Sequence, residues 1–314
     1  MLDVVLTPAG ALAVGTDVPG RVSLHQGGSA ANTARWLARL GVPTQLVGSV
    51  GRDEAGRALV AVLRADGVTP RVIRGGGART GRIGVLVGAG GERSFVADRG
   101  AADALAPGDL RGSWFRGVRL VHLPAYSLLG EPLGLAGREA VRMARSAGAL
   151  VTLDLASIGP LLAGGREAAL ALVREVAPDL LFATAGELSG LLGAGGGGGS
   201  ASAAAIASGS GINARAVELA PIVVVKRGAE GASVVVGATA AGASVVAFHV
   251  ATRPIAAADT TGAGDAFDAG FIAEWLASRT AGRSAIVGLR RAAVAGNRVA
   301  ARQVSTPRRE LQLG

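Results

Sequence analysis

Short apolar runs alternate with amphipathic helical patterns along most of the chain. The apolar runs are rich in valine and leucine, which is typical of buried strands. We predict strands at residues 45–50, 118–123, 150–155, 180–182 and 222–226, with helices between them at residues 54–65, 138–147, 167–176 and 187–192. Strands that alternate with helices predict an α/β fold, in which a mostly parallel central sheet is flanked by helices.

Two stretches interrupt this alternation. One is residues 4–25. The other covers residues 82–97, where two runs of strand-forming residues are joined by a turn at residues 88–92, and this pattern predicts a β-hairpin. In open parallel sheets, ligands bind beyond the carboxyl ends of the strands, so polar residues at those ends are candidates for a binding site.

The composition is that of a soluble enzyme. With 314 residues and 49% apolar content the chain can bury a substantial core, and we expect a single domain over residues 1–314. No long uncharged apolar run occurs, and the N-terminus lacks the basic start of a signal peptide, so we expect no membrane span and a cytoplasmic location. Because the chain has no cysteine, disulfides, thiolate metal sites and cysteine nucleophiles are excluded.

The net charge of +9 raises the question of nucleic-acid binding. The basic residues are nearly all arginines scattered singly, and Lys226 is the only lysine. With 3% aromatic residues the chain has little stacking surface for single strands, and it shows no basic recognition helix or zinc pattern. We therefore expect no nucleic-acid function.

Residues 259–267, Asp-Thr-Thr-Gly-Ala-Gly-Asp-Ala-Phe, are the most informative segment. Apolar residues recur at three- and four-residue spacing after it, which predicts a helix whose N-terminus holds Gly262, Ala263 and Gly264. The first N–H groups of a helix have no intrahelical partner and attract anions. Asp265 lies beside this anion site, where a carboxylate can accept the proton of a hydroxyl that attacks a phosphate. The alternative is an ordinary capping or first-turn aspartate.

A second glycine-led helix pattern lies at residues 27–41. Gly27 and Gly28 leave room for a ligand against the backbone, and Asn32 falls in the first turn. The amide of Asn32 has two donors and one acceptor, which suits vicinal hydroxyl groups. The alternative is a plain capped helix that stops at Gly41.

In this order and spacing, residues 27–41 and 259–271 resemble the two signature segments of the ribokinase-like (PfkB) carbohydrate kinase family. Residues 51–56, Gly-Arg-Asp-Glu-Ala-Gly, resemble the G-x-D-x-x-G helix of that family. The resemblance covers nearly the whole chain. It implies ATP-dependent phosphorylation of a hydroxyl group of a sugar or sugar-like substrate, with Asp265 as the general base.

The family resemblance also implies a three-layer ribokinase-like fold with a small β lid. The lid would be formed by about residues 4–25 and 80–98, with its hairpin turn near residues 91–95. In the family this lid covers the sugar and often pairs two subunits. A homodimer through the lid is therefore an expectation for this chain.

Further roles follow from the resemblance. Asp3 is similar to the acidic residue that grips sugar hydroxyls, with a terminal surface aspartate as the alternative. Glu187 is similar to the glutamate of the family's N-x-x-E segment, which holds Mg²⁺ through water, with a solvated helix glutamate as the alternative. The first position of that segment is Thr184 instead of asparagine, a departure that bears on metal binding.

A nucleotide site and a cation site are implied in the same way. Their residues would be Lys226, Gly228, Gly231 and Asn297 for ATP, and Asp259 and Thr261 for a monovalent cation such as K⁺. The alternatives are a simple turn before the next strand for the glycines and a helix-face position for the asparagine.

One departure concerns the start of the chain. Relatives have an additional hydrophobic strand before the position of Asp3, and this sequence starts almost at Asp3, so we expect either an upstream start or an open strand edge in the central sheet. Two rival functions remain open: a nucleoside kinase of the same fold, and a non-catalytic sugar- or nucleotide-binding protein. The lid is poor in aromatic residues apart from Phe95, which favours a bare sugar, and Asp265 favours catalysis.

Overall fold

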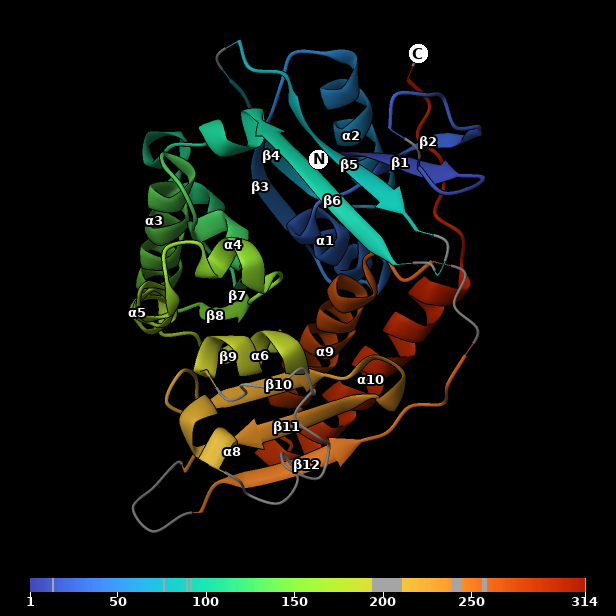
Figure 1. The fold of residues 1–314 in the computed structure, drawn as a ribbon. Helices are drawn as coiled ribbons and strands as arrows, with labels where there is room; N and C mark the ends of the chain where they lie inside the picture. The colour runs from blue at the N-terminus through green and yellow to red at the C-terminus, as the bar shows by residue number, and fades with distance from the viewer. Residues whose placement is uncertain are drawn as a thin grey trace. The chain divides into compact units, whose positions relative to one another are not determined.

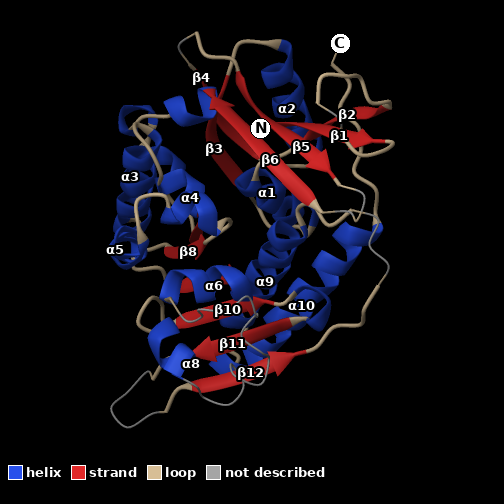
Figure 2. Cartoon of the chain, in the orientation of Figure 1, coloured by secondary structure: helices blue, strands red, loops and turns tan. Residues whose placement is uncertain are grey.

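The computed structural model describes the chain except residues 13, 76, 89, 91, 194–210, 239–243, 256–258 and 314. The described residues form two compact units. Unit 1 comprises Met1–Asp109 and Pro307–Gly314, and unit 2 comprises Leu110–Thr306. Figure 1 follows the chain through the elements of each unit, and Figure 2 distinguishes the helices from the strands.

Unit 1 contains a four-stranded sheet with the order β2-β1-β5-β6. Its strands are β1 (Leu2–Pro8), β2 (Gly20–Gln26), β5 (Thr80–Val87) and β6 (Arg93–Gly100). β1 runs parallel to β5, whereas the pairs β1–β2 and β5–β6 are antiparallel. These strands occupy both stretches where the sequence predicts the lid. In the turn between β5 and β6, residues 89 and 91 lie outside the described residues.

The remaining elements of unit 1 are α1 (Ser29–Arg39), β3 (Gln45–Val50), α2 (Glu54–Ala65), β4 (Thr69–Arg74), η1 (Ala101–Ala104) and η2 (Pro107–Asp109). α2 has the predicted bounds because Asp53 caps it: Asp53 Oδ1 accepts the N–H of Gly56 at 2.9 Å. The sequence predicts β3 in the central sheet, and this detail is wrong. β3 pairs in parallel with β4 in a separate two-stranded sheet, and it also contacts the 3₁₀-helix η1.

Unit 2 contains a six-stranded sheet with the order β12-β11-β10-β9-β8-β7. Its strands are β7 (Leu120–Pro124), β8 (Leu150–Asp154), β9 (Leu180–Thr184), β10 (Ile222–Lys226), β11 (Ala232–Val236) and β12 (Val246–Val250). The pairs from β7 to β10 are parallel, and β11 and β12 are added antiparallel. The predicted mostly parallel sheet is confirmed here. Its central strand β9 is fully buried from Leu180 to Ala183, which requires cover on both faces.

Helices provide this cover. The helices of unit 2 are η3 (Gly112–Trp114), η4 (Ala125–Leu128), α3 (Leu133–Ser146), α4 (Ile158–Leu162), α5 (Arg166–Val176), α6 (Ala185–Leu192), α8 (Gly211–Ala216), η5 (Gly228–Glu230), α9 (Ala263–Thr280) and α10 (Ala285–Ser305). α3 begins five residues before its prediction, since Leu133 and Ala136 are buried although the glycines beside them obscure the apolar pattern.

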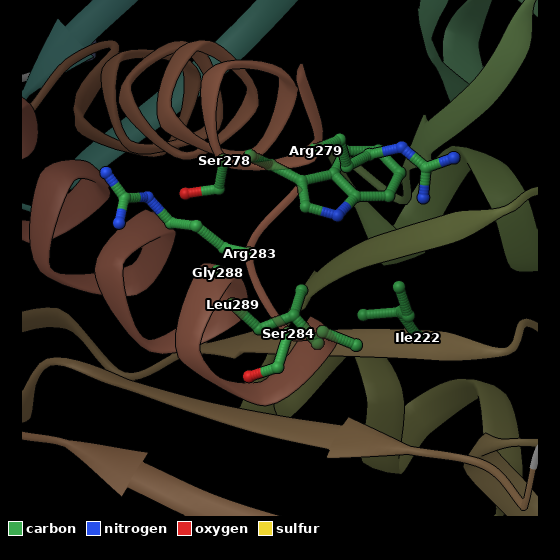
Figure 3. A pocket seen from close by; sticks show the side chains of 9 residues that line it. Ile222, Ser278, Arg279, Arg283, Ser284, Gly288 and Leu289 are labelled. Carbon is green, nitrogen blue, oxygen red and sulfur yellow. The ribbon is translucent and has the colours of Figure 1, made fainter. Parts of the chain in front are cut away.

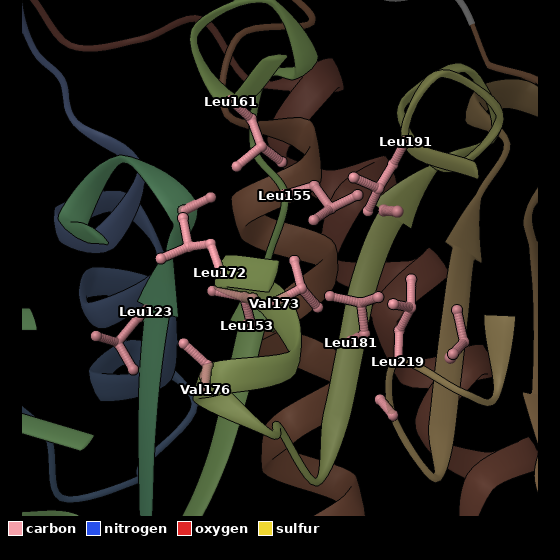
Figure 4. Close-up of a cluster of buried hydrophobic side chains, with 14 of the residues drawn as sticks. Leu123, Leu153, Leu155, Leu161, Leu172, Val173, Val176, Leu181, Leu191 and Leu219 are labelled. Atoms are coloured by element: carbon pink, nitrogen blue, oxygen red, sulfur yellow. The ribbon is translucent and has the colours of Figure 1, made fainter. Parts of the chain in front are cut away.

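The two faces of the sheet pack against different helices. Strand residues alternate between faces, so Leu153 and Leu181 join the apolar cluster beneath α3, α5 and α6 (Figure 4). Phe182 points to the other face, where its ring lies edge-on to those of Phe267 and Phe271 of α9. The predicted three-layer arrangement is therefore present in unit 2, with α9 on the face opposite the main cluster.

Replacing Phe182 by alanine should destabilise the protein strongly. The ring is fully buried and touches two further rings, so Phe182→Ala should lower the free energy of unfolding by about 3–5 kcal/mol in urea titrations. Phe95→Ala is the matched control because that ring is 60% exposed, and it should cost less than about 1 kcal/mol. Equal losses for the two variants would contradict the packing described here.

Candidate active site

α9 begins after a glycine in a left-handed conformation. Gly262 has φ 75° and ψ 9°, a region that other residues rarely adopt. The N–H of Ala263 donates to Thr260 O at 3.2 Å, and the N–H of Ala266 makes a helical bond to Gly262 O at 2.9 Å. The predicted helix start is confirmed, and its first turn combines backbone donors with the positive end of the helix dipole, an arrangement that attracts anions.

Asp265 lies in this first turn and is half-buried. A carboxylate in that place is next to the donors of the turn and retains contact with solvent. It can accept a proton from a hydroxyl group that approaches an anion held by the turn. The negative charge of Asp265 raises the pKa of Asp268, which lies one helical turn further along α9.

Asp259 and Thr261 lie immediately before α9. Asp259 Oδ1 accepts the N–H of Thr261 at 2.8 Å, and Gln303 of α10 donates to Thr261 O at 3.0 Å. Thr261 Oγ1 is buried and has no hydrogen-bond partner among the described residues, which exclude residues 256–258. An unpaired buried hydroxyl is costly, so this oxygen is a candidate ligand atom.

Lys226 ends β10 and is buried between two carboxyl groups. Its Nζ lies 2.9 Å from Asp154 Oδ1, at the end of β8, and 3.2 Å from Asp268 Oδ2 of α9. Its Nζ also lies over the ring of Phe182, 5.9 Å from the ring centre. A methyl group added to Gly264 would be 3.3 Å from Nζ, so the ammonium lies against the first turn of α9.

Burial and charge set the protonation of this cluster. Burial raises the pKa of the Asp268 carboxyl well above its ordinary value, the charge of Asp154 raises it further, and Lys226 opposes the change. Burial lowers the pKa of Lys226, but the nearby carboxylates of Asp154, Asp268 and Glu187 outweigh burial and raise it above its ordinary value. Lys226 is therefore a permanent cation, and Asp268 keeps its proton to a higher pH than an exposed aspartate does.

Glu187 and Thr184 form a capping box at the start of α6. Glu187 Oε2 accepts the N–H of Thr184 at 2.7 Å, and Thr184 Oγ1 accepts the N–H of Glu187 at 3.2 Å. Thr184 therefore has a structural role in the position where the family resemblance expects asparagine. Glu187 is half-buried and close enough to Lys226 to raise the pKa of that ammonium.

The residues predicted for the nucleotide follow β10. Gly228 has φ 57° with open space around it, whereas a methyl group at Gly231 would lie 2.2 Å from Val250 O. Gly231 thus allows close packing of the chain against β12. Asn297 of α10 is buried, and its Nδ2 donates to Val250 O at 3.1 Å, a contact that ties α10 to β12.

His122 of β7 belongs to the surroundings of Asp154. Its Nδ1 lies 3.0 Å from Thr152 Oγ1, and its ring lies edge-on to Phe182. Burial lowers the pKa of His122 to about 4, an effect that Asp154 opposes and Lys226 reinforces. The imidazole is therefore neutral at physiological pH.

In unit 1 the predicted sugar residues gather at the ends of β1 and β2. Asp3 is buried, and its Oδ2 accepts a hydrogen bond from Arg308 Nη1 at 2.8 Å. Burial raises the pKa of Asp3, and the bond and charge of Arg308 counteract this. A methyl group at Gly27 would lie 1.8 Å from Asp3 Oδ1, so glycine is required for the Asp3 carboxyl to fit.

Gly28 and Asn32 complete this group at the start of α1. Gly28 has φ 96° and precedes the helix, and the N–H of Asn32 donates to Gly28 O at 2.9 Å. Asn32 Oδ1 accepts a hydrogen bond from Gln26 Nε2 at 3.4 Å. The structure thus places Asp3, Gly27, Gly28 and Asn32 around one loop of unit 1.

A pocket of about 270 Å³ lies elsewhere in unit 2, between the end of α9 and the start of α10 (Figure 3). Trp275 and Leu289 line it with Arg279 and Arg283. It also touches Ile222, the first residue of β10, whereas Lys226 is the last. None of the predicted site residues lines this pocket.

Three charged residues that contact the predicted site residues were not predicted from the sequence. They are Asp154 and Asp268, which pair with Lys226, and Arg308, which pairs with Asp3. Asp154 ends a strand, the place where ligand-binding residues gather in parallel sheets, and Asp268 follows Asp265 by three residues on the same helix side. Those signals were available for both aspartates. Arg308 carries no such signal, because it reaches Asp3 across 305 residues.

In the described part of the chain, no group of three or more histidine, cysteine, aspartate or glutamate residues has a geometry that could hold a metal ion. Among the described helices, none is long and apolar enough to cross a membrane.

A family model for pfkB family carbohydrate kinases matches residues 1–308. The chain belongs to this family. Among curated pfkB-like relatives, fructokinase-1 of Zea mays is 39% identical over 131 residues, which are 41% of this chain and 41% of that protein. The probable fructokinase-4 of Arabidopsis thaliana is 36% identical over 141 residues, 44% and 43% of the two chains. The matches thus span about two fifths of the length of these relatives.

Solved structures show that the pfkB fold extends over the chain. A probable sugar kinase from Rhizobium etli has a TM-score of 0.76 at 23% identity and covers 97% of this chain and 90% of its own. Adenosine kinase from Sinorhizobium meliloti has a TM-score of 0.75 at 23% identity, with coverage of 98% and 91%. Fructokinase from Vibrio cholerae, solved with fructose, ADP and calcium, has a TM-score of 0.73 at 21% identity, with coverage of 96% and 90%.

The lowered pKa of His122 predicts an acid-sensitive stability. Unfolded histidine binds a proton near pH 6.5, but folded His122 does so only near pH 4. The neutral His122 therefore adds to the free energy of unfolding fully above about pH 6.5. As the pH falls towards 4, the free energy of unfolding decreases by about 3 kcal/mol. Urea unfolding between pH 7 and pH 4 should show a smaller loss of stability in His122→Asn than in wild type. If NMR showed that His122 takes up its proton near pH 6.5, this result would contradict the burial of the His122 ring.

Gly27→Ala should destabilise unit 1. The added methyl group would displace the Asp3 carboxyl and strain its bond to Arg308, so we expect a loss of about 1–3 kcal/mol in thermal or urea unfolding. Gly108→Ala is the matched control, since a methyl group there meets nothing within 4 Å. A wild-type stability of Gly27→Ala would refute the close approach of Gly27 to Asp3.

Proposed function

We propose that the chain is an ATP-dependent kinase that transfers the γ-phosphoryl group to a hydroxyl group of a sugar or sugar-like substrate. The observation that carries the proposal is the placement of Asp265 in the first turn of α9, three residues after the left-handed Gly262. There a proton acceptor lies next to backbone donors that attract an anion. Membership of the pfkB family supports the same chemistry.

In the proposed reaction, the substrate hydroxyl loses its proton to Asp265 as its oxygen attacks the γ-phosphorus. The new phosphorus–oxygen bond forms while the bond from the γ-phosphorus to the β–γ bridging oxygen breaks, and ADP leaves with the electron pair of that bond. Gly262, Ala263 and Gly264 form the anion hole for the charge that develops on the phosphoryl oxygens, for which the N–H of Ala263 would leave Thr260 O, its acceptor at 3.2 Å. Asp265 then releases its proton to solvent.

The other predicted residues bind the two substrates in this proposal. The sugar hydroxyls are held by residues of unit 1, namely Asp3, Gly27, Gly28 and Asn32. ATP is bound by residues of unit 2, namely Lys226, Gly228, Gly231 and Asn297. The buried carboxyl of Asp3 suits hydroxyl groups because carboxylates accept hydrogen bonds. In this proposal residues 1–314 form one kinase domain.

Mg²⁺ is the metal we propose for this reaction, held through water by Glu187. Glu187 uses Oε2 in the capping box, which leaves Oε1 for a water ligand, and Mg²⁺ commonly uses one carboxylate with waters and substrate phosphates. When bound, the ion would neutralise charge on the β- and γ-phosphates. Asp259 and Thr261 are proposed to bind K⁺, which the buried Thr261 Oγ1 supports, since it has no hydrogen-bond partner in the described part of the chain.

We also propose a homodimer through the lid sheet of unit 1. Phe95 and Val96 of β6 are 60% and 77% exposed, and such apolar side chains on an edge strand favour association. The proposed partners are otherwise small molecules, with no nucleic acid or membrane, and the proposed location is the cytoplasm, where ATP is supplied.

Fructose is the first substrate to examine, because the curated relatives are named fructokinases. A nucleoside is the alternative, since adenosine kinase shares the fold. Phe95 is the only aromatic residue of β5 and β6. A lid with few aromatic residues offers a nucleobase little stacking surface, which favours a sugar.

The decisive experiment measures ADP release from Mg-ATP with fructose, other hexoses, pentoses, keto-deoxy acids and nucleosides. Wild type should turn over one class, and Asp265→Asn should lose about 10²–10⁴-fold in kcat while it retains ATP binding in calorimetry. Glu274→Gln is the matched control, because this carboxylate lies on α9 but pairs with Arg291 at 2.6 Å. It should retain wild-type turnover.

Other outcomes would change the assignment. Turnover with nucleosides alone would replace the sugar by a nucleoside. Bound ATP without turnover on any substrate would indicate a non-catalytic binding protein. Near-normal turnover of Asp265→Asn would overturn the role of Asp265 as the base.

A further inference from the structure

Lys226 is the only lysine in a chain with 32 lysines and arginines. It is also buried, and the chain uses arginine in other ion pairs with a largely buried basic side chain, such as those of Arg227 and Arg308. In a sequence that otherwise uses arginine, one buried lysine indicates a position where a compact ammonium is required. A guanidinium is larger, and its planar fork spreads its donors over a wider area.

The carboxyls of Asp154 and Asp268 hold this ammonium from two sides. Asp154 Oδ1 lies 2.9 Å from Nζ, and the two oxygens of Asp268 lie 3.3 and 3.2 Å from it. Asp268 is also hydrogen-bonded to Asp154. With the carboxyl of Asp268 protonated, as its raised pKa favours, Asp268 donates to Asp154 and still offers an oxygen to Lys226.

Stability alone does not account for this cluster. Well-packed apolar residues in place of a buried ion pair are often as stable or more stable. The cluster lies at the carboxyl ends of β8 and β10 and against Gly264, in the first turn of α9. The cluster is neutral as a whole when Asp154 is ionised and Asp268 protonated, but its ammonium is the member that lies against a turn whose backbone already attracts anions.

On the basis of the proposed function, we infer that Lys226 stabilises the transferring phosphoryl group at the first turn of α9, and that Asp154 and Asp268 are positioning residues that hold its ammonium there. The ammonium charge favours the phosphoryl oxygens as negative charge develops on them. Asp154 and Asp268 act only through Lys226. No proton or bond is exchanged with the three residues, and the transfer itself is the one described above.

Because the chain has a single lysine, the ammonium can be observed directly. In protein labelled with ¹⁵N-lysine, Lys226 gives the one Nζ resonance of the chain. We expect this resonance to shift when Mg-ADP and aluminium fluoride, a mimic of the transferring phosphoryl group, are added with the sugar. Mg-ADP alone should shift it less, because it lacks the group at the γ-position.

Variants test the positioning role. Asp268→Ala removes one of the two partners of Lys226 and should lower kcat about ten-fold, the effect of one hydrogen bond to a charged group, with the KM for ATP changed less than about two-fold. Asp268→Asn should restore most of kcat, because its amide offers an oxygen to Lys226 and a donor to Asp154. Glu274→Gln on the same helix should leave both values unchanged.

The same variants report on Lys226 by NMR. Asp268→Ala should weaken the shift caused by aluminium fluoride, and Asp268→Asn should preserve it. A merely structural Asp268 would change the melting temperature and leave kcat of the folded fraction unchanged. If Asp268→Ala does not fold, the wild-type resonance still decides the question.

Failure of this inference and failure of the proposed function give different results. An Nζ resonance that does not move while calorimetry shows Mg-ADP and aluminium fluoride bound would overturn the role of Lys226 and leave the kinase assignment intact. Absence of any nucleotide binding would overturn the proposed function, and this inference with it. Wild-type kcat in Asp268→Ala would overturn the positioning role.

Discussion

The buried ammonium of Lys226 organises the carboxyl edge of the six-stranded sheet. Asp154 comes from β8, Lys226 from β10 and Asp268 from α9, so three elements meet at one charge. Removal of an ion from water costs several kcal/mol, which is offset only when good hydrogen bonds are made. The bonds therefore fix the two strands against the start of α9. Asp265, three residues before Asp268, and the turn at Gly262 are fixed with them.

Local patterns were sufficient to predict much of the fold and part of the site. The bounds of α2 and β10 follow from a cap residue and a continuous apolar run. The start of α9 follows from Gly262, because glycine is the residue that most readily adopts the left-handed conformation found there. Contacts between distant segments were not predictable in this way. The partner of Asp3 comes from the other end of the chain, and β3 pairs with β4 in a sheet of their own.

Thr184, where the family resemblance leads us to expect asparagine, has a structural role in the fold. Threonine is a good helix cap, and Thr184 forms a reciprocal capping box with Glu187. The box fixes Glu187 at the start of α6, near the charge of Lys226. A carboxylate held in this way suits a metal bound through water. The proposed metal site and the buried cluster therefore lie next to each other in unit 2.

The most direct test of the account is detection of the phosphorylated product. The purified chain would be incubated with Mg-ATP and fructose or another sugar of the panel, and ³¹P NMR would follow the reaction. We predict a sugar phosphate ester that appears in step with ADP and is absent without the sugar. ADP that accumulates equally without sugar, as inorganic phosphate is released, would contradict the central claim that this chain is a sugar kinase.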